Sequence, residues 1–142
     1  MRTFRSRRAR VVSIVVIVAS LLLFGGVAVL MPSTGPGAWG PADRVAMLAI
    51  GVGIGILMSR YATIHATASD AGLTVRNLAG PRTLAWSEID EVHFSGGMPW
   101  VRLHLRDGDE LAVMAIQKAD GPSAREDALE LATLVRRGHD RG

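Results

Sequence analysis

The first half of the chain contains two apolar segments whose lengths suit helices that cross a membrane. Residues 11–31 include no charged side chain, and at about 1.5 Å per residue a helix of this length matches a bilayer core of roughly 30 Å. A second, glycine-rich apolar run reaches that length only with its flanks, which gives residues 42–62. Residues 32–41 are rich in Pro and Gly and predict an external turn. The pattern predicts a two-helix transmembrane hairpin, with a re-entrant or surface helix as the alternative for 42–62.

After residue 62 the apolar positions recur every second residue, which is typical of half-buried β-strands. Val92 and Phe94 are expected in the core of one such strand, and Asp107-Gly108 is a strong signal for a β-hairpin. The six predicted strands cover residues 63–69, 73–77, 82–86, 91–95, 100–106 and 110–116. Short strands at this spacing indicate a small antiparallel barrel or sandwich.

A single amphipathic helix follows the last predicted strand. Ser123 and Glu126 fit a capping box that begins the helix, and Gly138 is expected to end it. The apolar face of this helix must pack against another part of the protein, and we expect it to cover an open end of the predicted barrel. The sequence thus predicts an α+β membrane protein, with a transmembrane hairpin, a β-barrel closed by a helix at residues 63–138, and a tail at residues 139–142.

The charges are distributed very unevenly. The net charge is +3, but residues 1–10 alone contain five arginines, whereas the chain from Tyr61 onward has nine basic and twelve acidic residues, a net charge of −3. Since positively charged flanks stay in the cytoplasm, residues 1–10 form a predicted basic cytoplasmic tail, and the C-terminal domain is expected on the same side. The alternative is an exported, antigen-like protein whose domain lies outside. A mildly acidic domain does not favour nucleic-acid binding.

Four segments of the second half follow one another in a fixed order. They are DAGLTVR at residues 70–76, WSEI at residues 86–89, LHLRDG at residues 103–108, and the final helix. Together they resemble the bacterial pleckstrin-homology-like (PH-like) domains of actinobacterial type. The resemblance implies a small barrel closed by a C-terminal helix, with Trp86 and Ile89 packed inward. A full barrel of this kind has seven strands, one more than the pattern shows.

Glycines in the second apolar segment suggest how the membrane helices associate. Gly51 and Gly55 form a small-xxx-small pattern, which lets two helices approach closely. Contact with the first helix of the same chain is the preferred interpretation. A homo-oligomer that associates through these transmembrane glycines is the alternative.

The sequence contains no recognisable catalytic or metal-binding pattern. The chain has no cysteine, and a metal site would need three or four converging ligands. Glu91 and His104 are expected to face each other as an ordinary cross-strand charged pair. The four histidines are His65, His93, His104 and His139. The sequence therefore predicts no enzyme, no cofactor and no metal.

The preferred hypothesis is a non-enzymatic, membrane-anchored, cytoplasmic module for protein interaction or assembly. Exposed strand edges and the loop that carries Met98 and Trp100 are the expected contacts for an unknown protein partner. The alternative is a domain that senses lipid headgroups through Arg76 and Arg82. Eukaryotic PH domains that bind phosphoinositides use Lys and Arg around the loop joining their first two strands, and the corresponding residues 69–72 are acidic here.

Overall fold

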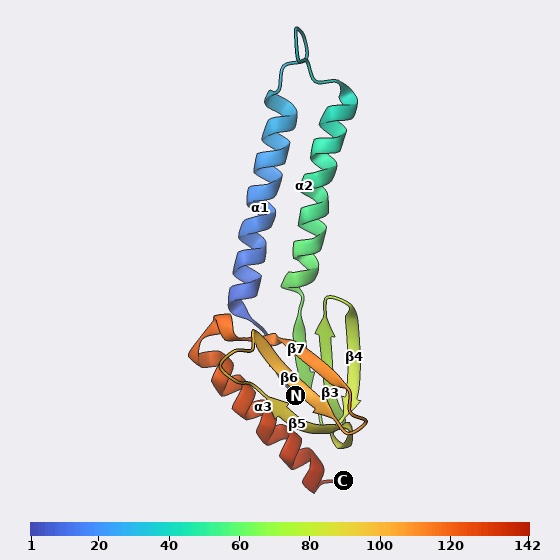
Figure 1. Cartoon of the computed structure of the whole chain (residues 1–142), viewed down its shortest axis with the longest axis vertical. Helices are drawn as coiled ribbons and strands as arrows, with labels where there is room; N and C mark the ends of the chain where they lie inside the picture. Colours follow the sequence, from blue (N-terminus) through green and yellow to red (C-terminus); the bar gives the residue numbers. More distant parts are fainter. The chain divides into compact units, whose positions relative to one another are not determined.

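The structure is a computed structural model that describes all 142 residues. The chain divides into two compact units (Figure 1). One unit is Ala9–Ala62, and the other combines Met1–Arg8 with Thr63–Gly142. The second unit therefore contains both ends of the chain.

The Ala9–Ala62 unit is a hairpin of two helices. Helix α1 (Arg7–Leu30) and helix α2 (Pro41–Ala62) are each long and apolar enough to cross a membrane, judged by length and composition. Most of their large aliphatic side chains are exposed. The Arg44 guanidinium donates to the carbonyl oxygens of Ala28 and Met31 and so satisfies backbone acceptors that the end of α1 leaves unpaired.

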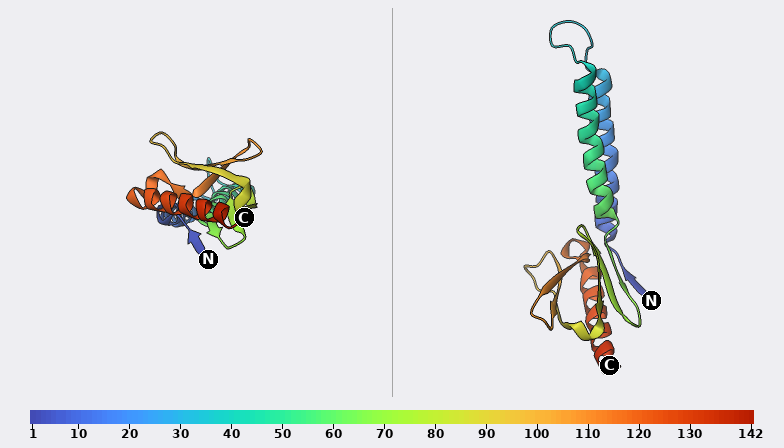
Figure 2. Two further views of the ribbon diagram at one scale, coloured as in Figure 1. Left: turned by 90° about the horizontal axis from the view of Figure 1, so that it is seen from below. Right: turned by 90° about the vertical axis from the view of Figure 1, so that its right-hand side faces the viewer.

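Seven antiparallel strands form two sheets in the other unit. The first sheet has the order β1-β2-β3-β4 and the second has the order β5-β6-β7 (Figures 1 and 2). The strands are β1 (Arg2–Phe4), β2 (His65–Ala68), β3 (Gly72–Asn77), β4 (Gly80–Ala85), β5 (Ile89–His93), β6 (Trp100–Leu105) and β7 (Glu110–Gln117). Short 3-10 turns η1 (Trp86–Glu88) and η2 (Lys118–Asp120) and helix α3 (Pro122–Asp140) complete the unit. The α+β fold class is confirmed.

Strand β1 is the element that the sequence pattern did not predict. It lies within the segment expected to be a basic tail and pairs with β2, with Arg2 opposite Ala68 and Phe4 opposite Ala66. Phe4 is only 1% exposed, so the N-terminus contributes an aromatic side chain to the domain core. The predicted count of six strands was therefore incomplete, and the strand that precedes the helical hairpin supplies the seventh.

The step from the first sheet to the second is fixed by Trp86. Its side chain is 5% exposed, and its indole Nε1 donates to the carbonyl oxygen of Ser69 at 3.0 Å. Ile89 is fully buried, so both inward-facing residues of the WSEI step are confirmed. The predicted inward positions of β3 and β6 are also confirmed, because Leu73, Val75, Val101, Leu103 and Leu105 are all buried.

Both predicted ends of helix α3 were wrong. The N-cap is Gly121 at a φ of 68°, Pro122 is the first helical residue, and the Ser123 hydroxyl donates to the Asp120 carbonyl oxygen at 3.0 Å. At the other end the helix runs past Gly138 to Asp140. Gly138 is instead a close contact, since a Cβ atom there would lie 2.4 Å from the Cβ of Trp86.

Candidate functional site: the groove between β5 and α3

Strand β5 is an edge strand of its sheet, and helix α3 packs against it (Figure 1). A hollow of about 380 Å³ opens between these two elements. Residues from the end of β5, the loop that follows it, η2 and α3 line this hollow. They are Val92, Phe94, Ser95, Gly96, Lys118, Arg125, Ala128, Leu129 and Ala132. We call this hollow, together with the adjoining one described below, the β5–α3 groove.

The floor of the groove is apolar because residues expected in the core face it. Val92 and Phe94 were predicted to be buried, yet both are only half-buried and line the hollow. Leu129 is 68% exposed and is the only exposed large apolar side chain among residues 63–142. Covering a side chain of this size contributes about 1.5–3 kcal/mol. The groove thus offers apolar surface that the domain itself leaves open to solvent.

Two basic side chains, Lys118 and Arg125, line this first hollow, and no acidic side chain lines it. The Lys118 ammonium donates to the Gly96 carbonyl oxygen at 2.5 Å, which ties the start of η2 to the loop after β5. Arg125 lies on α3, is exposed, and forms no ion pair or hydrogen bond through its side chain. Arg125 is therefore available to a negatively charged group.

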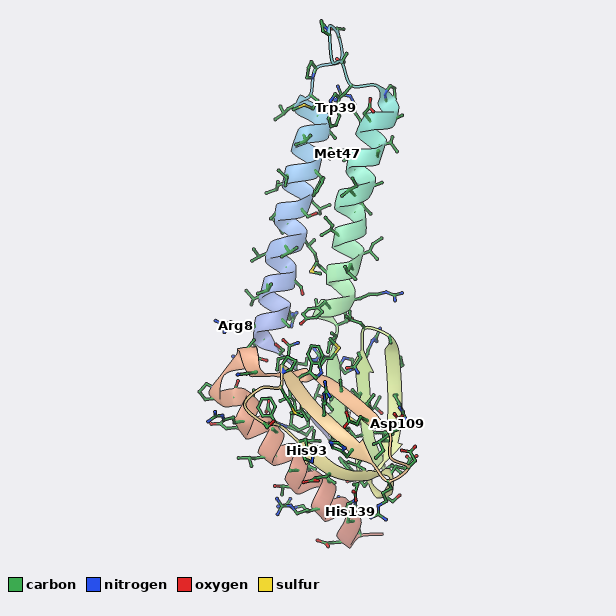
Figure 3. All side chains as sticks on the ribbon, viewed as in Figure 1. Arg8, Trp39, Met47, His93, Asp109 and His139 are labelled. Carbon is green, nitrogen blue, oxygen red and sulfur yellow. The ribbon has the colours of Figure 1, made fainter.

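A second hollow of about 380 Å³ continues along the same two elements. It shares Val92 and Ala132 with the first and extends to Glu91 and Arg136. His139 lies in the last turn of α3 (Figure 3), where its Nε2 is 2.8 Å from the carbonyl oxygen of Ile89 at the start of β5. This contact holds the helix against the strand, so the groove follows β5 from its start to the loop beyond its end.

Met98 and Trp100 lie beside the groove and do not line it. Both are half-buried. Met98 belongs to the turn after β5, closed by its backbone N–H to the Ser95 carbonyl oxygen at 3.0 Å, and Trp100 begins β6 opposite Gln117. Their role as partner contacts stays a prediction. The sequence pattern does not predict the groove, because its residues come from segments some 20 to 50 positions apart and no local pattern joins them.

The arginines considered for lipid binding are exposed on adjacent strands. Arg82 on β4 forms an ion pair with Asp109, at 3.2 Å between Nη1 and Oδ2 (Figure 3 labels Asp109). The backbone N–H of Glu110 and the Arg82 guanidinium together lower the pKa of Asp109 below its usual value. Arg76 on β3 has no ionic partner. Because Arg82 is already paired, these two residues do not form a free basic pair.

The two glycines of α2 differ in their surroundings. A Cβ atom at Gly51 would lie 2.9 Å from the Cβ of Phe24 on α1, and the Ser20 hydroxyl donates to the Gly51 carbonyl oxygen at 3.4 Å. An added Cβ at Gly55 would meet nothing within 4 Å. Gly51 thus lies at the contact between α1 and α2, whereas Gly55 faces open space.

The histidines on β5 and β6 form a surface cluster with ordinary partners. Glu91 is opposite His104 in the strand register, as expected, but it pairs with His93 at 2.9 Å instead. His104 pairs with Glu110 at 3.3 Å, and the rings of His93 and His104 meet edge to face at 4.4 Å. The structure contains no group of three or more His, Asp and Glu side chains placed to hold a metal ion.

Comparison with known proteins assigns the chain to a family. Residues 63–133 match the family model described as bacterial PH domain. The chain is 43% identical over 79 residues to the uncharacterized proteins Rv1417 of Mycobacterium tuberculosis and Mb1452 of Mycobacterium bovis, a match that covers 56% of this chain and 51% of each relative. It is 36% identical over 80 residues to low molecular weight protein antigen 6 of Mycobacterium tuberculosis, covering 56% of this chain and 68% of that protein. No solved structure gives a significant match.

The chain therefore belongs to the bacterial PH-domain family, and the resemblance inferred from its motifs is confirmed. It spans about half the length of the two mycobacterial relatives named first. Family membership and the two apolar helices together indicate a membrane- or lipid-associated interaction module.

Proposed function

We propose that this protein is a non-enzymatic membrane protein whose PH-like domain captures an extended segment of a protein partner in the β5–α3 groove. The observation that carries the proposal is the unpaired edge of β5 beside an apolar hollow. An edge strand presents backbone N–H and C=O groups that a further strand can pair with. A hollow next to that edge can receive the side chains of the added strand.

The partner segment would bind by strand addition. Its backbone would pair with the outer edge of β5, and alternate side chains would enter the groove, because successive residues of a strand point to opposite faces. Apolar side chains would contact Val92, Phe94 and Leu129. An acidic side chain would pair with Arg125, which has no ionic partner of its own. The proposed ligand is therefore an extended, apolar segment that carries a carboxylate.

The proposed setting is the cytoplasmic face of the cell membrane, with both helices crossing the bilayer. The pairing of β1 with β2 supports a common side for the N-terminus and the domain, because the two strands flank the helical hairpin in the chain. The five arginines before the first apolar segment support the cytoplasm as that side. Tethering at this membrane would keep the groove available to partners in or near the same membrane.

The test is selection of peptides by the full chain in lipid nanodiscs, from a phage-displayed library of random sequence. We expect enriched peptides with apolar residues at alternate positions and at least one Asp or Glu. Leu129→Glu should weaken their binding about tenfold or more, because it places a charge in the apolar floor and removes a contact. Binding can be measured by fluorescence anisotropy of the labelled peptides.

Thr133→Glu is the matched control. Thr133 is exposed on the same helix, one turn further on, and does not line the groove, so the same charge is introduced outside the proposed site. We expect this variant to bind the peptides like the wild type. Peptides that bind the Leu129→Glu protein with unchanged affinity, or a selection that enriches no sequence pattern, would show that the groove is not a peptide site.

A further inference from the structure

A further hollow, separate from the two that form the β5–α3 groove, lies where the N-terminal segment meets the start of α3. It measures about 650 Å³, and all its lining residues belong to the unit that contains the β-sheets. Three of them are the arginines Arg5, Arg7 and Arg8, which follow β1 in the chain. The others are Ala119, Asp120, Gly121, Pro122, Ser123 and Asp127. We call this hollow the arginine pocket.

The acidic side chains of the arginine pocket already have partners. Asp120 accepts a hydrogen bond from the backbone N–H of Arg8 at 3.2 Å, and the Arg8 guanidinium donates to the Ala119 carbonyl oxygen at 2.6 Å (Figure 3 labels Arg8). Asp127 pairs with Arg2 at 3.5 Å. η2 thus holds Arg8 in place, and the carboxylates of Asp120 and Asp127 both already have interaction partners.

Arg5 and Arg7 form no ion pair and no side-chain hydrogen bond anywhere in the structure. Both are exposed and line the arginine pocket. Two guanidinium groups that share one hollow suit a phosphate, because each can donate two parallel hydrogen bonds to its oxygen atoms. The first turn of α3 has no acidic residue and no side-chain cap, so its backbone adds partial positive charge to the same hollow.

Chain connectivity places the arginines of this pocket next to the end of the proposed membrane helix α1, where the helix would meet the membrane surface. Arg7 is the first residue of α1, and the uncharged segment begins at Val11, about 6 Å further along the helix axis. Lipid headgroups lie at that depth when the apolar segment spans a bilayer, and anionic lipids attract basic residues next to it. A dissolved phosphate ester shares the same chemistry, but nothing else about the pocket selects it.

We propose that the arginine pocket binds the phosphate of an anionic phospholipid through Arg5 and Arg7. The site is separate from the β5–α3 groove and shares no residue with it. Lipid bound there would contact the segment between β1 and α1 and the junction of η2 with α3 at the same time. A headgroup would thereby fix the orientation of the PH-like domain relative to the lipid surface.

Native mass spectrometry of the full chain in detergent tests this proposal. The probes are phosphatidylglycerol, phosphatidylcholine and glycerol 3-phosphate, each titrated separately. We expect one phosphatidylglycerol per chain to be retained in preference to phosphatidylcholine. The double variant Arg5→Gln/Arg7→Gln should weaken this binding at least about tenfold, because it removes charge-assisted hydrogen bonds from both sides of the phosphate.

The control variant is Arg106→Gln/Arg137→Gln, which loses the same charge from two exposed arginines outside the arginine pocket. It should retain phosphatidylglycerol like the wild type. Thermal unfolding of both double variants checks the fold, and we expect little change, since the Arg5 and Arg7 side chains form no ion pair and no hydrogen bond. Equal weakening in both variants would mean diffuse electrostatic attraction and would overturn the site. Glycerol 3-phosphate binding as tightly as the lipid would overturn the lipid assignment.

Discussion

At the scale of single residues, Gly138 is a position where glycine is required, but for a different reason from the helix end that the sequence predicts. Glycine after an amphipathic stripe is a common helix stop, so the sequence favoured an end there. The structure uses the missing Cβ differently, because α3 crosses Trp86 at a distance that leaves no room for a side chain. A contact between residues about 50 positions apart leaves no trace in the local pattern.

Replacing Gly138 with Ala should destabilise the domain. The new Cβ would meet the Cβ and Cγ of Trp86 at 2.4 Å, so the helix or the indole must shift, which costs about 1–3 kcal/mol. Thermal unfolding of the full chain in detergent, followed by circular dichroism, measures the effect. Gly97→Ala is the control, because a Cβ there would meet nothing within 4 Å. A stability of Gly138→Ala equal to that of this control would contradict the close contact.

Strand alternation was the most reliable signal at this scale, and it failed at one place for a physical reason. Leu73, Val75 and Leu103 are buried as their spacing predicts. Val92 and Phe94 follow the same rule, yet they face a groove that α3 does not close. Periodicity tells which side chains share a face of a strand, but it does not tell whether another element covers that face.

At the scale of elements, the N-terminal strand is the main addition to what the sequence predicts. β1 is only three residues long, contains Arg2 and Thr3, and lies about 60 positions before its partner β2. Neither length nor alternation marks it as a strand. The charge pattern relates Arg2 only to membrane orientation, although Arg2 also forms ion pairs with Asp127 and Glu130 on α3, the latter at 3.0 Å.

Replacing Phe4 with Ala should destabilise the PH-like domain even though Phe4 precedes the helical hairpin. The side chain is 1% exposed, and removing a buried phenylalanine costs about 3–5 kcal/mol. Thermal unfolding of the full chain, followed by its tryptophan fluorescence, to which Trp86 and Trp100 of the domain contribute, measures this loss. Thr3→Ala is the control, since Thr3 is exposed and makes only a long contact of 3.4 Å with the Thr67 hydroxyl. A tail that merely orients the chain in the membrane would make the two variants alike.

At the scale of the whole molecule, the chain leaves the unit that contains the β-sheets after β1 and returns to it before β2. The sequence predicted that the N-terminus and the domain share one side from the arginine bias alone. The β1–β2 pairing supports the same conclusion independently, because strands on opposite sides of a membrane cannot form hydrogen bonds to each other. The choice between cytoplasm and exterior still depends on charge.

Single cysteines can test both parts of this topology, since the natural chain has none. Thr3→Cys, Ser33→Cys and Ser87→Cys place one thiol each at exposed positions in β1, the turn between α1 and α2, and η1. With a maleimide that does not cross membranes, intact cells should label Ser33→Cys alone, and permeabilised cells should label all three. The inverse pattern would place the domain outside. Different labelling of Thr3→Cys and Ser87→Cys would exclude the β1–β2 pairing, because both positions belong to one folded unit and must meet the reagent together.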